Sequence, residues 1–132
     1  MSAAAALQQA IYLKLAGDAA LTALIGSDGL HDHLHAGTRR PCIHIAGIDS
    51  RESGTASEAG EEHLVTLTVM TGEGGNLPAQ RIAARVGALL DDADLDLDGF
   101  ALISLFHRRT RTGRDARAKG HVADMLFRAV TE

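Results

Sequence analysis

The segment His107–Gly120, with the sequence HRRTRTGRDARAKG, has the residue types of an interaction site. It holds six of the chain's 13 lysines and arginines and one of its 17 acidic residues, so its formal charge is +5 while the other 118 residues carry −9. Arginine forms bidentate pairs with carboxylates and is enriched at protein interfaces. We therefore interpret the segment as a protein-binding arm between two strands. Its candidate contact residues are Arg108, Arg109, Arg111, Arg114 and Arg117, with Lys119 beside them.

A nucleic-acid backbone is an alternative partner for this arm, because spaced arginines can follow a row of phosphates. The rest of the chain opposes that reading. The net charge is −4, and a nucleic-acid-binding domain is more often basic. One tyrosine, three phenylalanines and no tryptophan leave few aromatic faces on which bases could stack. An exposed hairpin loop with solvated arginines is the remaining, purely structural reading.

Three aspartates alternate with leucines in the stretch DLDLDG, Asp94–Gly99. This stretch matches the first half of an EF-hand loop, which places oxygen ligands at positions 1, 3 and 5 and glycine at position 6. Position 12 requires a bidentate carboxylate but is Leu105, so the coordination sphere would stay open. We instead expect an acidic contact that pairs with arginines of a neighbouring subunit. Its residues are Asp94, Asp96 and Asp98.

Three histidines also alternate, in the stretch HDHLH at His31, His33 and His35. On an extended segment all three would face one side, as a transition-metal site requires. No Cys-x-x-Cys or His-Glu-x-x-His pattern accompanies them, and such close spacing rarely gives tetrahedral geometry. We expect solvated histidines and no bound metal, with a small metal- or ligand-binding domain as an alternative function.

Enzyme signatures are missing from the sequence. It contains neither the Gly-x-Ser-x-Gly turn of a serine nucleophile nor a Gly-x-x-x-x-Gly-Lys phosphate loop. The glycine-rich stretch Gly72–Asn76 lacks that lysine, and the single Cys42 stands in an apolar run typical of a buried hydrophobe. We therefore expect a protein that is not an enzyme and uses no cofactor.

The elements that position these residues follow from periodicity and from helix and turn signals. The 132 residues are expected to form a single domain, 1–132. The fold class is α+β in the order α-α-β-β-α-β-β, an antiparallel sheet with helices packed on one face. Polar loops are expected at Ser27–Arg40 and Asp49–Gly60. Predicted helices span Ala3–Ala16, Ala19–Ile25 and Leu77–Leu90, and predicted strands span Pro41–Ile48, Glu61–Thr71, Phe100–Arg108 and Lys119–Thr131.

Four segments together resemble one family of phage and prophage proteins. They are LQQAIYLKLAGDAALTALIG (Leu7–Gly26), PCIHIAG (Pro41–Gly47), EEHLVTLTVMT (Glu61–Thr71) and the closing G-R-D…G-x-x-x-x-x-L-F-R-A-V-x-E (Gly113–Glu132). In order and spacing they are similar to the tail-terminator, or tail-completion, proteins of long-tailed phages and gene-transfer-agent particles. The resemblance spans nearly the whole chain.

This resemblance implies a structural virion protein that forms a ring, commonly of six subunits, at the head-proximal end of the tail tube. Such a ring halts tube polymerisation and joins the tail to the head. The implied partners are further copies of the chain, the major tail tube protein and the head-completion or connector proteins, with DNA crossing the lumen without specific binding. The implied location is the tail–head junction of the virion.

Two further sequence features bear on where the chain acts and on what else it could be. No signal peptide is visible and no apolar run approaches the ~20 residues that span a bilayer, so we expect synthesis in the bacterial cytoplasm and no membrane partner. Another neck component, a head-closure protein, is the alternative within the same class. The family offers no catalytic residues to carry over.

Overall fold

The computed structural model of the chain describes residues 1–35, 37–54 and 59–132. Within these residues, three helices and five strands form an α+β fold, as the sequence predicts. The helices are α1 (Ala3–Ala16), α2 (Ala19–Ile25) and α3 (Leu77–Leu90), and the strands are β1 (Leu30–His31), β2 (Cys42–Glu52), β3 (Glu61–Thr71), β4 (Leu102–Arg114) and β5 (His121–Thr131).

The three helices begin and end where the sequence places them. The Ser2 hydroxyl accepts a hydrogen bond from the backbone N–H of Ala5 at 3.1 Å and so caps the start of α1. Asp18 caps α2 in the same way through the N–H of Leu21 at 2.9 Å. These side chains satisfy donors that the first helical turn leaves free. Asn76 occupies the N-cap position of α3 but makes no capping hydrogen bond with its side chain.

The strands form one sheet in the order β1-β2-β3-β5-β4. The pairs β2–β3, β3–β5 and β5–β4 are antiparallel, as expected. The two-residue strand β1 adds a parallel edge, with Leu30 opposite Ile43 and His31 opposite His44. The sheet is therefore mixed, and part of the segment predicted as a polar loop forms a strand because its backbone pairs with β2.

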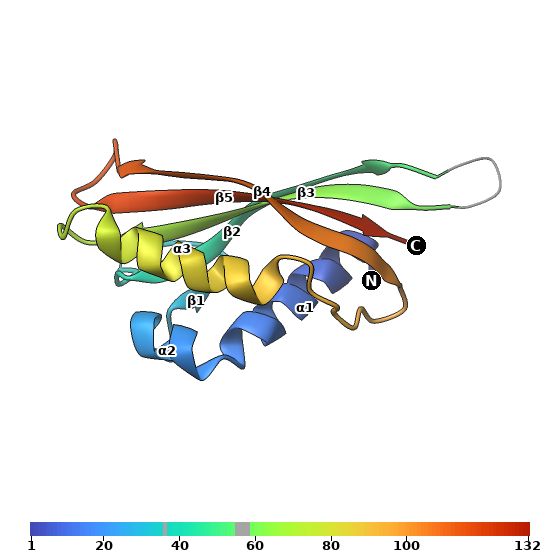
Figure 1. Cartoon of the computed structure of the whole chain (residues 1–132), viewed down its shortest axis with the longest axis horizontal. Coiled ribbons are helices and arrows are strands. Elements are labelled where there is room, and N and C mark those ends of the chain that lie inside the picture. The colour runs from blue at the N-terminus through green and yellow to red at the C-terminus, as the bar shows by residue number, and fades with distance from the viewer. Residues whose placement is uncertain (36, 55–58) are drawn as a thin grey trace.

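The helices cover one face of the sheet and leave the other face open (Figure 1). Alternate side chains of each strand point toward the helices, as the two-residue period of a strand requires. On β3 these are Val65, Leu67 and Val69, each fully buried. On β5, Phe127 is likewise fully buried and anchors the core where β4 and β5 meet.

Two strands run further than the sequence suggests. β2 continues beyond Ile48 to Glu52, because Asp49 pairs with Leu64 and Glu52 with Glu61. β4 continues beyond Arg108 to Arg114, so most of the basic segment is strand and its prediction as a loop between strands is wrong. Residues 55–58 of the predicted loop Asp49–Gly60 lie outside the described residues.

In the described part of the chain, no helix combines the length and the apolar character needed to cross a membrane.

Candidate interaction surface

The basic segment is the end of an edge strand followed by a tight turn. Between Arg108 and Arg114 it belongs to β4, which lies at the outer edge of the sheet. The turn that follows is closed by a hydrogen bond of 2.9 Å from the N–H of Asp115 to the carbonyl of Gly120. Gly120 has a φ of 134°, and a Cβ on it would lie 2.2 Å from the Thr71 carbonyl oxygen, so this close approach requires glycine.

The strand register fixes the direction of two arginines. Arg109 pairs with Leu126 and Arg111 with Asp124, and residues directly opposite on paired strands share a face. Met125, between these two partners, is buried toward the helices. Arg109 and Arg111 therefore stand on the open face of the sheet, two residues apart along one strand.

An open cleft of about 630 Å³ lies between the β4–β5 hairpin and the outward side chains of β2 and β3. We name it the basic cleft. His44, Thr68 and Met70 line it from β2 and β3. Its arginines outnumber its acidic residues four to two; these six residues are Arg40, Arg111, Arg114, Arg117, Asp115 and Asp124.

Both acidic residues of the basic cleft already have partners. Arg40 Nη2 donates to Asp115 Oδ2 at 2.8 Å, and this hydrogen bond, with a second from the Arg117 N–H, lowers the pKa of the Asp115 carboxyl below its usual value. Asp124 accepts a hydrogen bond from the Thr68 hydroxyl at 2.9 Å. The cleft is therefore left with an excess of positive charge.

The five predicted contact arginines are all exposed. Among the described residues, none of them forms an ion pair with an acidic side chain. These guanidinium groups are therefore exposed and without an acidic partner in the described part of the chain. These are Arg108, Arg109, Arg111, Arg114 and Arg117.

His44 lies on the floor of the basic cleft with its Nδ1 atom buried and without a hydrogen-bond partner in the described structure. Burial lowers the pKa of this imidazole, Asp124 raises it and His31 lowers it. His44 lies in the predicted strand Pro41–Ile48, and the sequence indicated no role for it. Its place in the cleft depends on the β2–β3–β5 register, which no local pattern encodes.

The acidic stretch forms a loop that is anchored by its leucines, and we name it the acidic loop. Leu95 and Leu97 are buried in the core with 8% and 9% exposure. A bridge between Leu97 and Phe100, with Gly99 at a φ of 82°, closes its end. The three aspartates between and beside the leucines, Asp94, Asp96 and Asp98, are exposed.

The two aspartates that precede the acidic loop hold β4 in place. The Asp91 carboxylate accepts a hydrogen bond from the His107 N–H at 2.9 Å, and the Asp92 N–H donates to the Leu105 carbonyl at 2.8 Å. Asp92 reaches this position with a φ of 58°, which aspartate tolerates better than most residues. These contacts explain acidic residues at a helix C-terminus, where the dipole disfavours them.

One chain does not bring its basic and acidic contact residues together. In Figure 1 the β4–β5 hairpin lies at the left end of the molecule, while the connection from α3 to β4 lies right of the centre, below the sheet and near the two termini. The predicted pairing of arginines with aspartates therefore requires two copies of the chain if it occurs at all.

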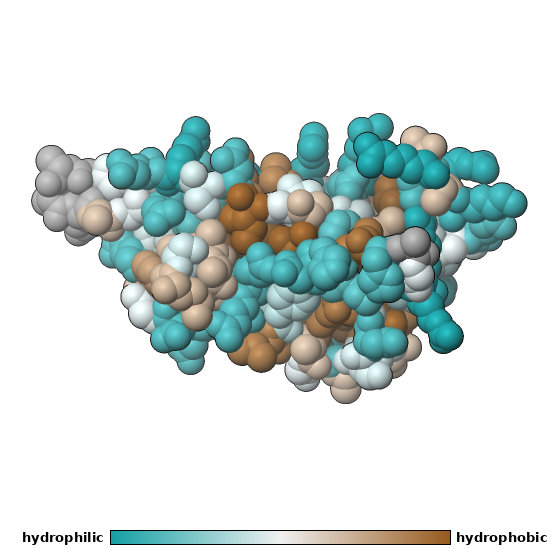
Figure 2. Space-filling view, turned by 180° about the vertical axis from the view of Figure 1, so that it is seen from behind, coloured by the Kyte–Doolittle hydropathy of each residue, from teal (hydrophilic) through white to brown (hydrophobic). Residues whose placement is uncertain are grey.

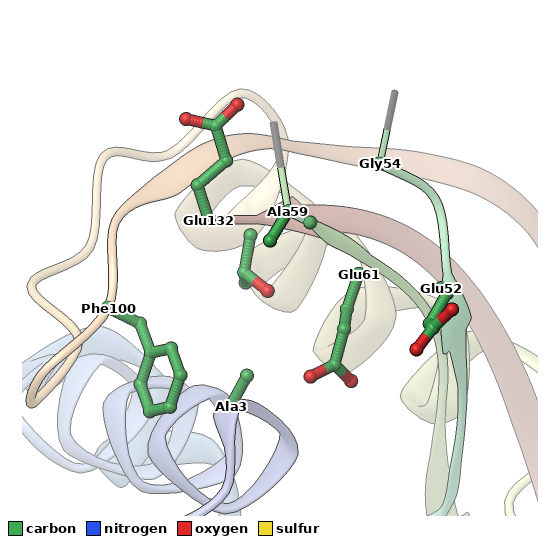
Figure 3. Close-up of a pocket in the computed structure, with 9 residues that line it drawn as sticks. Ala3, Glu52, Gly54, Ala59, Glu61, Phe100 and Glu132 are labelled. Carbon is green, nitrogen blue, oxygen red and sulfur yellow. The ribbon is translucent and has the colours of Figure 1, made fainter. Parts of the chain in front are cut away.

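A second acidic site, which the sequence did not reveal, lies near the two termini. Glu52, Glu61 and Glu132 surround an opening of about 560 Å³ with Ala3 and Phe100 on its wall (Figure 3). These glutamates come from β2, β3 and the end of the chain, so only the folded register gathers them. We name this opening the acidic pocket.

Beside the acidic pocket, a polar network joins three strands. Glu62, only 8% exposed, accepts hydrogen bonds from Arg51 Nε at 2.9 Å and Arg128 Nε at 2.8 Å. These bonds, that of Arg128 first, lower the pKa of the Glu62 carboxyl. The neighbouring His63 contacts the Ser50 hydroxyl at 2.6 Å and the Thr131 hydroxyl at 2.9 Å. The network fixes this end of the sheet.

The open face of the sheet also carries apolar side chains. Phe106 and Ile103 on β4 are 45% and 54% exposed. Figure 2 views the molecule from behind with the sheet close to edge-on, and on that side hydrophobic surface gathers near mid-length. The half-buried apolar residues on the outward side of β3 and β5 are Leu64, Met70, Val122, Leu126 and Val130.

Comparisons with known proteins identify the family. The family model described as "Tail completion protein gp17" matches residues 9–132. The chain belongs to this family of tail completion proteins. A solved structure titled "Virion of native gene transfer agent (GTA) particle" contains a chain that is 31% identical, with a TM-score of 0.90 over 99% of this chain and 98% of that chain. No curated protein matches the sequence.

The tail completion fold does not assemble the predicted histidine cluster into a metal site. Among the described residues, no group of three His, Cys, Asp or Glu side chains is placed to hold a metal ion. His31 lies in β1, while His35 Nδ1 accepts a hydrogen bond from the Gly37 N–H at 3.2 Å. The acidic loop likewise forms no such group. Cys42 is a free, buried thiol, and burial raises its pKa.

Proposed function

We propose that this protein is a tail terminator, a ring that closes the head-proximal end of a phage-like tail tube and stops its polymerisation. One observation carries the proposal. The family model matches residues 9–132. The similarity to a chain of a gene-transfer-agent virion, with a TM-score of 0.90, covers 99% of this chain. These matches leave almost no part of the chain unaccounted for and support a structural role in the virion, which we assign to the tail–head junction.

The partners follow from that position. Copies of the chain surround the lumen, six of them if the ring follows the family resemblance, with the major tail tube protein on one side and the head-completion or connector proteins on the other. DNA crosses the lumen without specific binding, which suits a chain of net charge −4. We assign the five exposed arginines of the basic segment, with Asp94, Asp96 and Asp98, to these protein contacts.

The open sheet face supports an assembly role. Phe106 and Ile103 are exposed there, next to half-buried side chains on β3 and β5, and contiguous exposed apolar surface marks protein contacts. In an assembled ring such a face would be covered at least in part. The whole chain, 1–132, acts as one domain in this proposal.

Light scattering and negative-stain microscopy of the purified protein test the ring. We expect a concentration-dependent, ring-sized oligomer, or a ring that forms when isolated tail tubes are added. A protein that stays monomeric at high concentration and does not bind to tube ends contradicts the proposal.

A further inference from the structure

The basic cleft has the shape and charge of a receptor for carboxylates. Three of its four arginines, Arg111, Arg114 and Arg117, have no ion pair among the described residues, while Arg40 is held by Asp115. Its volume of about 630 Å³ is large enough to admit several side chains of a partner segment. Guanidinium groups pair bidentately with carboxylates.

The acidic loop has the matching form. Its buried leucines fix the backbone while its aspartates alternate outward. The cleft presents three guanidinium groups, those of Arg111, Arg114 and Arg117, at intervals of three residues along the chain. The loop therefore offers three exposed carboxylates to three arginines that form no ion pair among the described residues.

We propose that the basic cleft of one subunit receives the acidic loop of a second copy of this chain. The inference rests on the proposed ring and specifies which surfaces meet in it. The β4–β5 hairpin, whose residues line the cleft, and the connection from α3 to β4, which holds the loop, lie apart along the molecule (Figure 1), so one chain offers both halves of the contact without neutralising itself. A contact between two different patches repeats from copy to copy, and it produces a ring when the rotation between neighbouring copies closes.

Other occupants fit less well. The acidic pocket is itself a concavity, and two concavities cannot fill one another. A nucleic-acid backbone would have to bind a chain whose net charge is −4 and which has one tyrosine, three phenylalanines and no tryptophan on which bases could stack. The acidic loop is the one feature of this chain that presents three exposed carboxylates on an anchored backbone without an ion pair in the described structure.

Charge exchange between two variants tests the contact. The cleft variant carries Arg111→Glu and Arg114→Glu, and the loop variant carries Asp94→Lys, Asp96→Lys and Asp98→Lys. Each variant alone places like charges across every contact, so we expect self-association about 100-fold weaker than for the wild type. An equimolar mixture should recover association, because a glutamate-bearing cleft then meets a lysine-bearing loop and the unchanged cleft meets the unchanged loop.

A third variant controls for the overall change of charge. Glu52→Lys, Glu73→Lys and Glu132→Lys make the same change in net charge as the loop variant at three other exposed positions, two of them at the acidic pocket. We expect this variant to associate like the wild type and not to rescue the cleft variant. Circular dichroism checks that all three variants fold.

Sedimentation velocity at fixed salt, with and without isolated tail tubes, gives the readout. If the cleft and loop variants still form rings, the proposed contact is wrong, but the terminator function is not contradicted. The same conclusion holds if mixing the two variants does not restore association. A wild type that neither self-associates nor binds to tubes rejects the contact and the ring together. Binding of a labelled DNA duplex that the cleft variant loses, without any effect on association, would assign the cleft to nucleic acid.

Discussion

Arg85 on α3 holds the carboxylate of Asp18, with its Nε atom 2.8 Å from Asp18 Oδ2 and its Nη2 atom on Oδ1. The same carboxylate caps α2 through the Leu21 N–H. The Asp18 side chain thus caps the start of α2 and links α2 to α3 through Arg85, which lies 67 residues further along the chain. The ion pair could not be predicted from the sequence, because Arg85 belongs to a distant element.

This pair predicts a particular loss of stability in acid. The hydrogen bond from Arg85, then that from Leu21, lowers the pKa of Asp18 to about 2 from 3.8. Since the folded pKa lies below the unfolded one, the carboxylate stabilises the fold fully above pH 3.8, and this contribution is lost as the pH falls through about 2. Asp18→Asn should lower stability at pH 7 and remove this part of the pH dependence.

Urea unfolding of both proteins at pH 7 and at several values between pH 4 and pH 2 measures the effect. Identical slopes of stability against pH in that range would show that the Asp18–Arg85 pair contributes nothing. Arg85→Lys is a useful companion variant, because it keeps the charge but removes the bidentate geometry.

His63 should stabilise the fold only in its neutral state. Burial lowers the pKa of this imidazole below 6.5, against a smaller opposing effect of Glu61. Because the folded pKa is depressed, stability falls as the pH drops from 6.5 toward the folded pKa. Thr131→Val removes the hydroxyl partner of Nε2 and should cost about 1–3 kcal/mol.

Thr131→Ser retains that hydroxyl and serves as the control. Thermal unfolding at pH 7.5 compares the three proteins. If the valine variant is as stable as the serine variant, the hydrogen bond to His63 does not stabilise this end of the sheet.

The pKa of His44 reports on the charge in the basic cleft. Asp124 raises it against the lowering caused by burial and His31. Asp124→Asn should therefore lower the pKa of His44 further, as seen by NMR titration of the imidazole. Glu73→Gln, an exposed change outside the cleft, should leave the pKa of His44 unchanged. An unchanged His44 pKa in the Asp124 variant would mean that the two groups do not interact.

Substitutions in the acidic loop can separate the role of its buried leucines in the core from the role of its exposed aspartates. Leu95→Ala or Leu97→Ala removes a buried side chain and should destabilise the fold by about 2 kcal/mol, at the low end for such changes because both sites are at the edge of the core. Replacing Asp94, Asp96 and Asp98 by asparagine should alter stability by about 0.5 kcal/mol or less per site. Chemical denaturation measures both, and equal losses would contradict the division of roles.

The helices and β3 could be predicted from sequence because their signals are local. Asp18 and Gly17 mark the break between α1 and α2, and Val65, Leu67 and Val69 alternate along β3. These patterns need no partner from elsewhere in the chain. The α+β class followed from the order of such elements.

The length of β4 could not be predicted in this way. Its second half, from Arg109 to Arg114, has no buried apolar side chain of its own, so it lacks the periodicity of a half-buried strand. Pairing with β5 makes it a strand, through partners such as Asp124 opposite Arg111. The basic cleft and the acidic pocket could not be predicted for the same reason: strand register brings together residues that are far apart in the sequence.

Electron microscopy of particles produced without this protein tests the central claim most directly. A ring that stops tube growth and joins the tail to the head predicts overlong tails, tails without heads, or both, and restoration of normal particles when the wild-type protein is supplied. Tails of normal length, joined to heads in the protein's absence, would contradict the terminator function.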